Sequence, residues 1–428
     1  MTLGAAATPV DEDRVTTSFE VLDALGLAEL RKRRGDLDGT VPMRAVQGCP
    51  PLLAGNAFGF QVTLLQPITL RRRSGTWTVG FREPFGDALA VGHRVALPRL
   101  VRQGFVRPDD EFARTFAEGF VKPGADGLLL WTGLCVRADP GVSLRVSATA
   151  NRRNRSVGVT EQWIADAQGF VPLVLHLTLP ADGPDRVLLD GEVATVTPLA
   201  PGVRIEEVPL AAAPQVGVAH AAFFDPAYEA SKRRGPTRKY RTLHPPPEEG
   251  DGPSWCRVVP LGPATHTVAP DVPRLVLGNH VPFEASFDGR TVTIDPDCGA
   301  LRAGAREVER TFADAMGPRF LDHNWFAVRY FTHYLTAHPP GEPHFFANPW
   351  VFVQTPPGWS CLLEGVHGDG VDGLRAVVAT DVFHTVPAVF QLLAAAAPVR
   401  FDRGQPLLEV IPVPRRLMQS GFRQVQLG

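Results

Sequence analysis

Residues 348–360 read Asn-Pro-Trp-Val-Phe-Val-Gln-Thr-Pro-Pro-Gly-Trp-Ser, and this stretch decides the fold class. Val351–Gln354 is a short apolar, β-branched run that ends at a Pro-Pro-Gly turn, and Ser360–Val366 resumes an extended, mostly apolar pattern. We therefore expect two strands joined by a tight corner. Further short runs follow at similar spacing, at Arg375–Ala379, Val386–Leu393 and Leu407–Val413. Short strands separated by glycine and proline predict an antiparallel sandwich, roll or barrel rather than alternating strands and helices.

An earlier part of the chain repeats this pattern. The turn Pro140–Ser143 matches Pro357–Ser360 through a shared Pro-Gly-x-Ser core. Other matches follow in the same order along the chain: Val171–Leu177 with Val386–Leu392, Leu52–Phe60 with Leu275–Phe283, and Arg114–Glu118 with Arg310–Asp314. Ordered matches at a nearly constant offset predict an internal duplication. The expected fold is mainly β (α+β), with two homologous antiparallel β domains of the sandwich or roll type, each with a packed helix.

At 428 residues the chain is too long for one compact core, so the duplication indicates where to divide it. The expected segments are an N-terminal helical segment at 1–40, a first β domain at 41–205, a proline-rich, basic connecting arm at 206–255, a second β domain at 256–416 with an aromatic insertion at 318–350, and a C-terminal tail at 417–428.

Three helices are expected. Thr16–Arg34 carries Phe19, Leu22 and Leu25 at helical spacing, and the basic run Arg31–Arg34 before Gly35 suits a helix C-terminus. The same basic run could instead bind an anion. The other two helices are expected at Asp109–Phe120 and Arg302–Met316, where aromatic and apolar residues recur every four positions.

Composition excludes several protein classes. A hydrophobic content of 44%, a charged content of 21% and a net charge of −2 are ordinary for a globular protein and give no general attraction to nucleic acid. No apolar run of about 18 residues predicts a membrane helix, and the N-terminus lacks a secretory pattern. The five cysteines are widely spaced, without a Cys-x-x-Cys pair. We expect a cytoplasmic protein with free thiols that binds neither nucleic acid nor membrane.

Searches for catalytic motifs find none. The glycine-rich nucleotide loops are missing, and Ser360 with Cys361 follows a turn between strands rather than a strand-to-helix elbow. Six histidines in the second half lack the usual metal-ligand spacing: His323, His333, His338, His344, His367 and His384. We expect no metal and no cofactor, with these histidines half-buried among aromatic residues.

Several strings resemble an uncharacterised bacterial family of unknown function, whose members show a Thr-Pro-Pro-Gly-aromatic turn, a Glu-Thr-Asp segment and an Arg-Phe-x-x-Gly-Glu-Pro turn. They are Thr355–Ser360, Thr380–Phe383, Val399–Pro406, Val410–Pro412 and Cys49–Asn56. Ala379 stands where that family has an acid, and the resemblance implies no activity. The order of turns also resembles the β-clip fold of deoxyuridine triphosphatases. Because their catalytic strings are missing here, that resemblance implies topology only.

On function, a binding protein is favoured over an enzyme. A sheet edge, an aromatic groove and basic flanking residues suit an extended peptide, as in the maturation of bacterial peptide natural products. The alternative is a tailoring enzyme of specialised metabolism that uses the aromatic and histidine region as its pocket, with or without a metal. For a peptide or small-molecule ligand, the predicted site comprises Trp325, Phe326, Tyr330, His333, His344, Trp350, Arg238, Lys239 and Tyr240. Equally, these aromatics could pack between the domains or at a homodimer seam.

Overall fold

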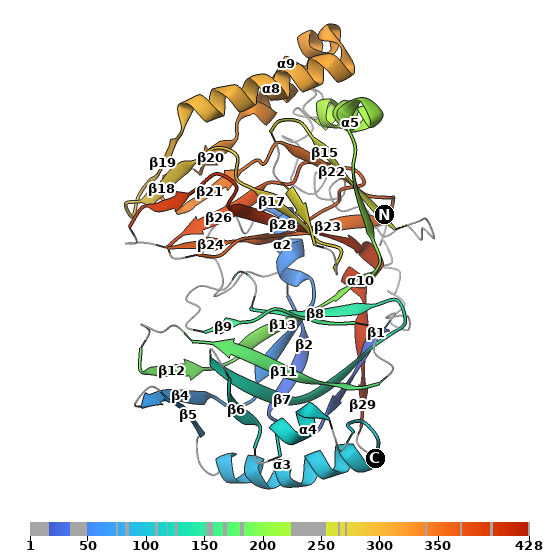
Figure 1. Ribbon diagram of the computed structural model, residues 1–428, viewed down its shortest axis with the longest axis vertical. Coiled ribbons are helices and arrows are strands. Elements are labelled where there is room, and N and C mark those ends of the chain that lie inside the picture. The colour runs from blue at the N-terminus through green and yellow to red at the C-terminus, as the bar shows by residue number, and fades with distance from the viewer. Residues whose placement is uncertain are drawn as a thin grey trace, which may run out of the picture.

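The computed structural model describes residues 17–34, 49–73, 76–81, 85–107, 110–117, 119–124, 127–149, 151, 157–165, 169–179, 184–223, 254–263, 266–269, 272–338, 340–368, 370–393 and 397–426. Strands predominate in this part of the chain and form seven sheets, most of whose pairs are antiparallel. The predicted mainly β, α+β class is confirmed. Figure 1 shows two sheet-rich halves stacked along the long axis, with helices at both ends.

The lower half in Figure 1 contains three sheets. The largest has the order β29 (Gly421–Val425), β1 (Thr17–Asp23), β7 (Gly127–Ala138), β11 (Val171–Thr178) and β9 (Gly158–Val159), with β6 (Val121–Gly124) also paired to β7. The second has the order β10 (Gln162–Ile164), β8 (Ser143–Ser147), β13 (Glu192–Leu199), β3 (Phe60–Leu64) and β2 (Ala28–Lys32). The third is β12 (Arg186–Leu189), β4 (Ile68–Arg73) and β5 (Thr76–Phe81).

The upper half contains the other four sheets. One has the order β16 (His266–Val268), β17 (Leu275–Gly278), β28 (Pro406–Pro414), β23 (Trp359–Gly365) and β25 (Arg375–Val378). A second is β20 (Leu335–Ala337), β21 (His344–Ala347), β26 (Ala388–Leu392) and β24 (Val371–Gly373). The two small sheets are β19 (Val292–Pro296), β18 (Phe283–Phe287) and β27 (Val399–Phe401), and β14 (Arg204–Glu207), β15 (Trp255–Pro260) and β22 (Val351–Gln354).

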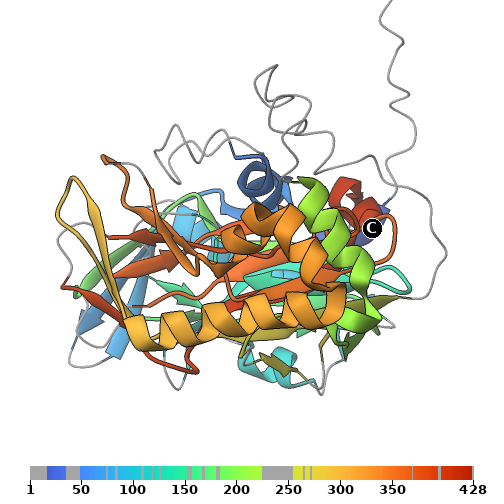
Figure 2. The ribbon, with the colours of Figure 1, turned by 90° about the horizontal axis from the view of Figure 1, so that it is seen from above.

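Helices cover the two far ends of the molecule. The lower end carries α3 (Phe85–Arg102) and α4 (Glu111–Thr115), and the upper end carries α5 (Pro214–Phe223), α8 (Cys298–Met316) and α9 (Pro318–Thr332), which Figure 2 shows lying across the top. The short helix α2 (Pro50–Ala57) lies between the halves and contacts β25. A 3-10 turn at Leu210–Ala212 and the short helix α10 (Arg415–Gln419) complete the set. Among the described helices none is long and apolar enough to span a membrane.

The two halves repeat one pairing scheme. Strand β13 lies between β3 and β8 just as β28 lies between β17 and β23, and β12-β4-β5 has the same order as β27-β18-β19. The register agrees too, because Ser143 pairs with Leu199 while Ser360 pairs with Val413. The two Pro-Gly-x-Ser turns therefore occupy equivalent places, each between a strand of one sheet and a strand of the next.

Each half also lends a strand to the other. Strand β14, at the end of the first half, pairs in parallel with β15 of the second half. Strand β29, at the end of the second half, pairs in parallel with β1 of the first half, and Figure 1 shows it running down beside β1. The predicted tail at 417–428 was therefore wrong, since it contains β29, which forms one edge of the six-stranded sheet.

The predicted N-terminal helix was also wrong. Within residues 17–34 the structure has two strands, β1 and β2, which belong to different sheets, and β1 is paired on both edges. The apolar residues of Thr16–Arg34 are divided between two short strands by a turn at residues 24–27, and only in the unbroken sequence do they resemble a helical pattern. In that turn the Asp23 carboxylate accepts hydrogen bonds from the backbone N–H groups of Leu25 and Gly26. An aspartate that accepts from the backbone two and three residues later, followed by glycine at φ +64°, marks a turn.

Other expectations need correction. Among the described residues of Asp109–Phe120 only α4 is helical. The principal helix of the first half, α3, was not predicted, and it contains Pro98, a residue type that disfavours a helix interior. The helix at Arg302–Met316 is confirmed as part of α8. The match of Leu52–Phe60 to Leu275–Phe283 was misplaced. Phe60 pairs with Val196 and Leu275 pairs with Val410, and Val196 and Val410 hold equivalent positions, so Phe60 corresponds to Leu275 rather than to Phe283.

The connecting arm predicted at 206–255 is not an extended segment throughout. Residues 206–223 form the end of β14, the 3-10 turn and α5, which is an ordered layer against α8 and α9. Its basic, proline-rich remainder, residues 224–253, lies outside the described residues.

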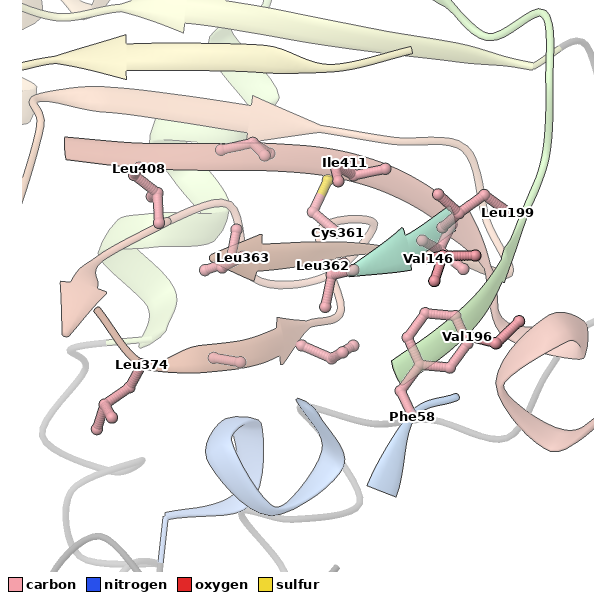
Figure 3. Packing of buried hydrophobic residues seen from close by; sticks show 14 of the residues in the cluster. Phe58, Val146, Val196, Leu199, Cys361, Leu362, Leu363, Leu374, Leu408 and Ile411 are labelled. Atoms are coloured by element: carbon pink, nitrogen blue, oxygen red, sulfur yellow. The ribbon is translucent and has the colours of Figure 1, made fainter. Parts of the chain in front are cut away.

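Apolar side chains join the halves at their centre. Figure 3 shows Val146, Val196 and Phe58 of the first half gathered beside Leu362 of β23, and all four are buried. These residues belong to a single buried apolar cluster that includes side chains of both halves, so the junction is a continuous core. Burial of apolar surface stabilises such a junction by about 25 cal/mol per Å². Charged residues lie at the edge of this junction, and they form the candidate site.

Candidate functional site

A cavity of about 350 Å³ lies between the two halves. Its wall takes residues from β8, β9, β23, β24, β25 and β28 and from the loops beside them. They are Arg145, Ser147, Ala148, Asn151, Val159, Glu161, Glu364, Gly365, Val366, His367, Gly373, Arg375 and Glu409. Both halves therefore contribute to one hollow.

Four sheets end at this cavity. Strands β9 and β10 are the last strands of two lower sheets, and β24 and β25 are the last strands of two upper sheets. Val159 lies on β9, Glu161 directly before β10, Gly373 on β24 and Arg375 on β25, and all four line the cavity. Figure 1 shows β9 and β24 on the same side of the molecule, facing each other across the junction.

Arg145, in the middle of β8, is surrounded by three carboxylates. Its Nε donates to Glu161 at 2.7 Å, its Nη1 pairs with Glu364, and its Nη2 pairs with Glu161 and lies 3.3 Å from Glu409. Arg274 joins the network from outside the wall, with Nη1 at 2.8 Å from Glu161 and 3.2 Å from Glu409. The network thus links β8 of the first half to β23 and β28 of the second.

Arg375 is the second buried cation of the wall. Its Nη2 donates to the Thr197 hydroxyl at 2.8 Å, and its Nε lies 3.2 Å from a Glu364 oxygen. Asn151 fixes its backbone by accepting from the Arg375 N–H at 2.6 Å and donating to the Arg375 carbonyl at 3.1 Å. The Nη1 of Arg375 has no hydrogen-bond acceptor among the described residues. A buried guanidinium N–H without an acceptor is costly unless something else supplies one.

The accessible charge of the wall is negative. The side chains of Glu161, Glu409 and Glu364 are 27%, 25% and 16% exposed. Two of the guanidinium groups that neutralise them are sealed behind, with 4% exposure for Arg145 and 2% for Arg375, whereas Arg274, outside the wall, is 24% exposed. A ligand that enters the cavity therefore meets these carboxylates before it meets Arg145 or Arg375.

The carboxylates differ in how firmly they hold their charge. Burial alone would raise the pKa of Glu364, but the Arg145 and Arg375 guanidiniums outweigh burial and lower that pKa to about 2. Burial raises the pKa of Glu409, which its two longer contacts with Arg145 and Arg274 do not offset. Burial also lowers the pKa of Arg375 to about 10. Glu409 is thus less neutralised by its arginine partners than Glu364 is.

The residues of the predicted aromatic site do not gather at this cavity. Trp325 is 56% exposed on α9, where the Arg329 guanidinium lies 5.8 Å from its ring centre, and His333 is exposed just after that helix. Phe326 and Tyr330 lie on the same helix, and the orientation of their side chains is not described. Arg238, Lys239 and Tyr240 lie outside the described residues.

Trp350 and His344 belong to the core instead. Trp350 is fully buried, with its ring 4.7 Å from that of Tyr334 and against Gly304 of α8. His344 is fully buried on β21, beside His338 at 6.2 Å between ring centres. Trp350 packs against α8 and His344 is buried on β21, so these two members of the predicted aromatic site belong to the core rather than to a surface groove.

The Pro-Gly-Trp turn before Ser360 is held by a buried ion pair. Arg415 donates to both carboxylate oxygens of Asp381, at 2.8 and 2.6 Å, and Asp381 also accepts from the Gly358 backbone N–H at 3.0 Å. This clamp explains the turn structurally. Among the described residues, no group of three histidine, cysteine, aspartate or glutamate side chains is placed to hold a metal ion.

The cavity residues were missed because the sequence was searched for known motifs. The signal was nevertheless present, since single charged residues interrupt apolar strands at Leu144-Arg145-Val146 and Leu408-Glu409-Val410. Arginine and glutamate are rarely buried without partners, so charges within buried strands predict a paired network. Comparison with known proteins adds no assignment: no family model matches the chain, and no curated protein matches it.

Proposed function

We propose that the protein is a binding protein that holds an extended peptide segment in the cavity between its two halves. The observation that carries this proposal is the convergence of four sheet edges, β9, β10, β24 and β25, on one charged cavity. The last strand of a sheet has backbone N–H and C=O groups that a peptide can pair with by adding a strand. On β25 and β24 the outward groups of Arg375 and Val371 are already bound by Asn151 and Gly368, so strand addition is proposed for β9 and β10.

The size of the cavity supports the proposal. A volume of about 350 Å³ lies at the lower end of the range for ligand sites and suits one or two residues of a peptide, with the rest of the peptide running along the strand edges. The aromatic and histidine region lends no support to a tailoring enzyme, because its described members divide between the core and the exposed face of α9. A place in peptide natural-product maturation remains an expectation from the sequence.

Strand β9 offers a specific test of strand addition. The Thr160 N–H donates to the His176 carbonyl, so the alternation of an antiparallel pair leaves the Val159 N–H directed away from β11. Purified protein would be equilibrated with a randomised octapeptide library, and retained peptides would be counted by mass spectrometry. Val159→Pro removes the outward N–H and should lower retention several-fold, whereas Val159→Ala keeps the N–H and should retain peptides as the wild type does.

Two results would count against the proposal: no retention of peptides by the wild type, or equal retention by the proline variant when both variants unfold at the same temperature.

We also propose that the two halves arose by duplication of one unit. Support comes from the shared pairing scheme and from the equal register of Ser143 and Ser360. The same register makes Ser147 equivalent to Glu364 and Glu161 equivalent to Arg375, since Gln162 pairs with Val146 and Arg375 with Glu364. Glu161 and Arg375 would then be equivalent positions with opposite charges, while Ser147 is uncharged where Glu364 carries a charge.

A further inference from the structure

We infer that the cavity recognises a primary ammonium group of its ligand, with Glu409 as the principal acceptor. This inference rests on the proposed peptide-binding function and names the chemistry that the cavity selects. The ammonium could be the N-terminus of a peptide or the end of a lysine side chain.

The placement of the charges carries the inference. Arg145 and Arg375 are almost completely sealed, while the partly exposed polar surface of Glu161, Glu364 and Glu409 faces a hollow that a ligand can enter. An ammonium has three donors and no acceptor, so it can be satisfied by three carboxylate oxygens around it. A ligand carboxylate would instead meet like charge at the wall.

Glu409 is the carboxylate with the most capacity to spare. Its contacts with Arg145 and Arg274 are 3.3 and 3.2 Å long, whereas Glu161 accepts from Arg145 at 2.7 Å, from Arg274 at 2.8 Å and from the Trp163 indole at 2.6 Å. A charge-assisted hydrogen bond from an ammonium would therefore add most at Glu409.

A second, independent observation points to a ligand that also carries an acceptor. The Nη1 of Arg375 lacks an acceptor although the side chain is 2% exposed and belongs to the cavity wall. A carbonyl oxygen next to the ammonium, as in the first residue of a peptide, would supply this acceptor once the Arg375 side chain moves to admit it, because the Nη1 atom is buried in the free protein. The N-terminal ammonium is therefore the source that the geometry favours over lysine.

The test uses three octapeptide libraries of matched composition, all lacking arginine. The first has a free N-terminus and no lysine, the second is N-acetylated and contains lysine, and the third is N-acetylated without lysine. We expect the wild type to retain the first library best and to exclude the third. Retention of the second library at the level of the first would show that a lysine ammonium serves as well as an N-terminal one and would still support recognition of a primary ammonium.

Equal retention of the third library would overturn this inference and leave peptide binding intact. Retention of none of the libraries would overturn the proposed function together with it. Glu409→Gln keeps the size of the side chain and removes the charge, and should weaken retention of the preferred library by about tenfold. The control Glu284→Gln changes an exposed glutamate on β18 outside the cavity wall and should bind as the wild type does, and equal loss in both variants would also contradict the inference.

Discussion

Glu364 is the residue on which the buried charge network depends most, because it faces both Arg145 and Arg375. Glu364→Gln would leave two sealed guanidiniums with less negative charge near them. Removing one partner of a buried ion pair costs about 3–5 kcal/mol. We expect a loss of that order in the free energy of unfolding, measured by urea denaturation at neutral pH. A loss as small as that of the exposed control Glu284→Gln would show that the network contributes little to stability.

The pH dependence of this contribution has a definite sign. The pKa of Glu364 is lowered from 4.5 to about 2 in the folded protein, so its ionised form is favoured by folding. The stabilisation is complete above the unfolded pKa and is lost as pH falls through the folded pKa. We therefore expect the stability difference between wild type and Glu364→Gln to shrink between about pH 4.5 and about pH 2. A difference that stays constant over this window would contradict the assigned pKa shift.

At the scale of elements, α8 and the bend at Trp350 just before β22 fit too closely to admit another atom. A Cβ added to Gly304 would lie 1.9 Å from Cζ3 of the Trp350 ring. Gly304→Ala should destabilise the fold by about 1–3 kcal/mol or more, although alanine is the better helix former. Gly92→Ala on α3 is the matched control, since nothing lies within 4 Å of the added atom. Thermal unfolding of the two variants would test the difference, and an unchanged Gly304→Ala melting temperature would contradict the packing.

The sequence predicts an element when local residue types determine it, and it does not predict an element that depends on pairing between distant residues. Strands and turns of the second half, such as the turn at Pro357–Ser360, follow from local residue types and were predicted. The pairing of β1 with β29 could not be predicted, because it joins residues some 400 positions apart that carry no local mark. The charged cavity could not be predicted either, because the sequence shows isolated charges but not which strands bring Arg145 to Glu364.

Strand β29 illustrates what a distant pairing contributes. Phe422 stacks on Phe19 at 5.7 Å and meets Phe60 edge-on at 5.4 Å, both in the first half. Ending the chain after Gln419 would expose one edge of β1 and remove this aromatic contact. We expect a lower melting temperature and a tendency to aggregate through the freed edge, while removal of residues 427 and 428 alone should have no effect. Equal melting temperatures of the two truncated proteins would show that β29 adds nothing to the first half.

At the scale of the whole molecule, the reciprocal pairings of β14 with β15 and of β29 with β1 make each half incomplete without the other. The segment between the halves, residues 224–253, offers a place to divide the chain outside the described elements.

Two fragments, 1–238 and 239–428, should therefore associate when produced together, because the apolar junction and both exchanged strands can form between separate chains. We expect co-purification through a tag on one fragment and a circular dichroism spectrum like that of the intact chain. Arg204→Pro on β14 should weaken the association, because it removes the Arg204 N–H that donates to the Ser254 carbonyl just before β15. Fragments that each fold and remain separate would show that the exchanged strands do not hold the halves together, and the interfacial cavity would then need a covalent link to persist.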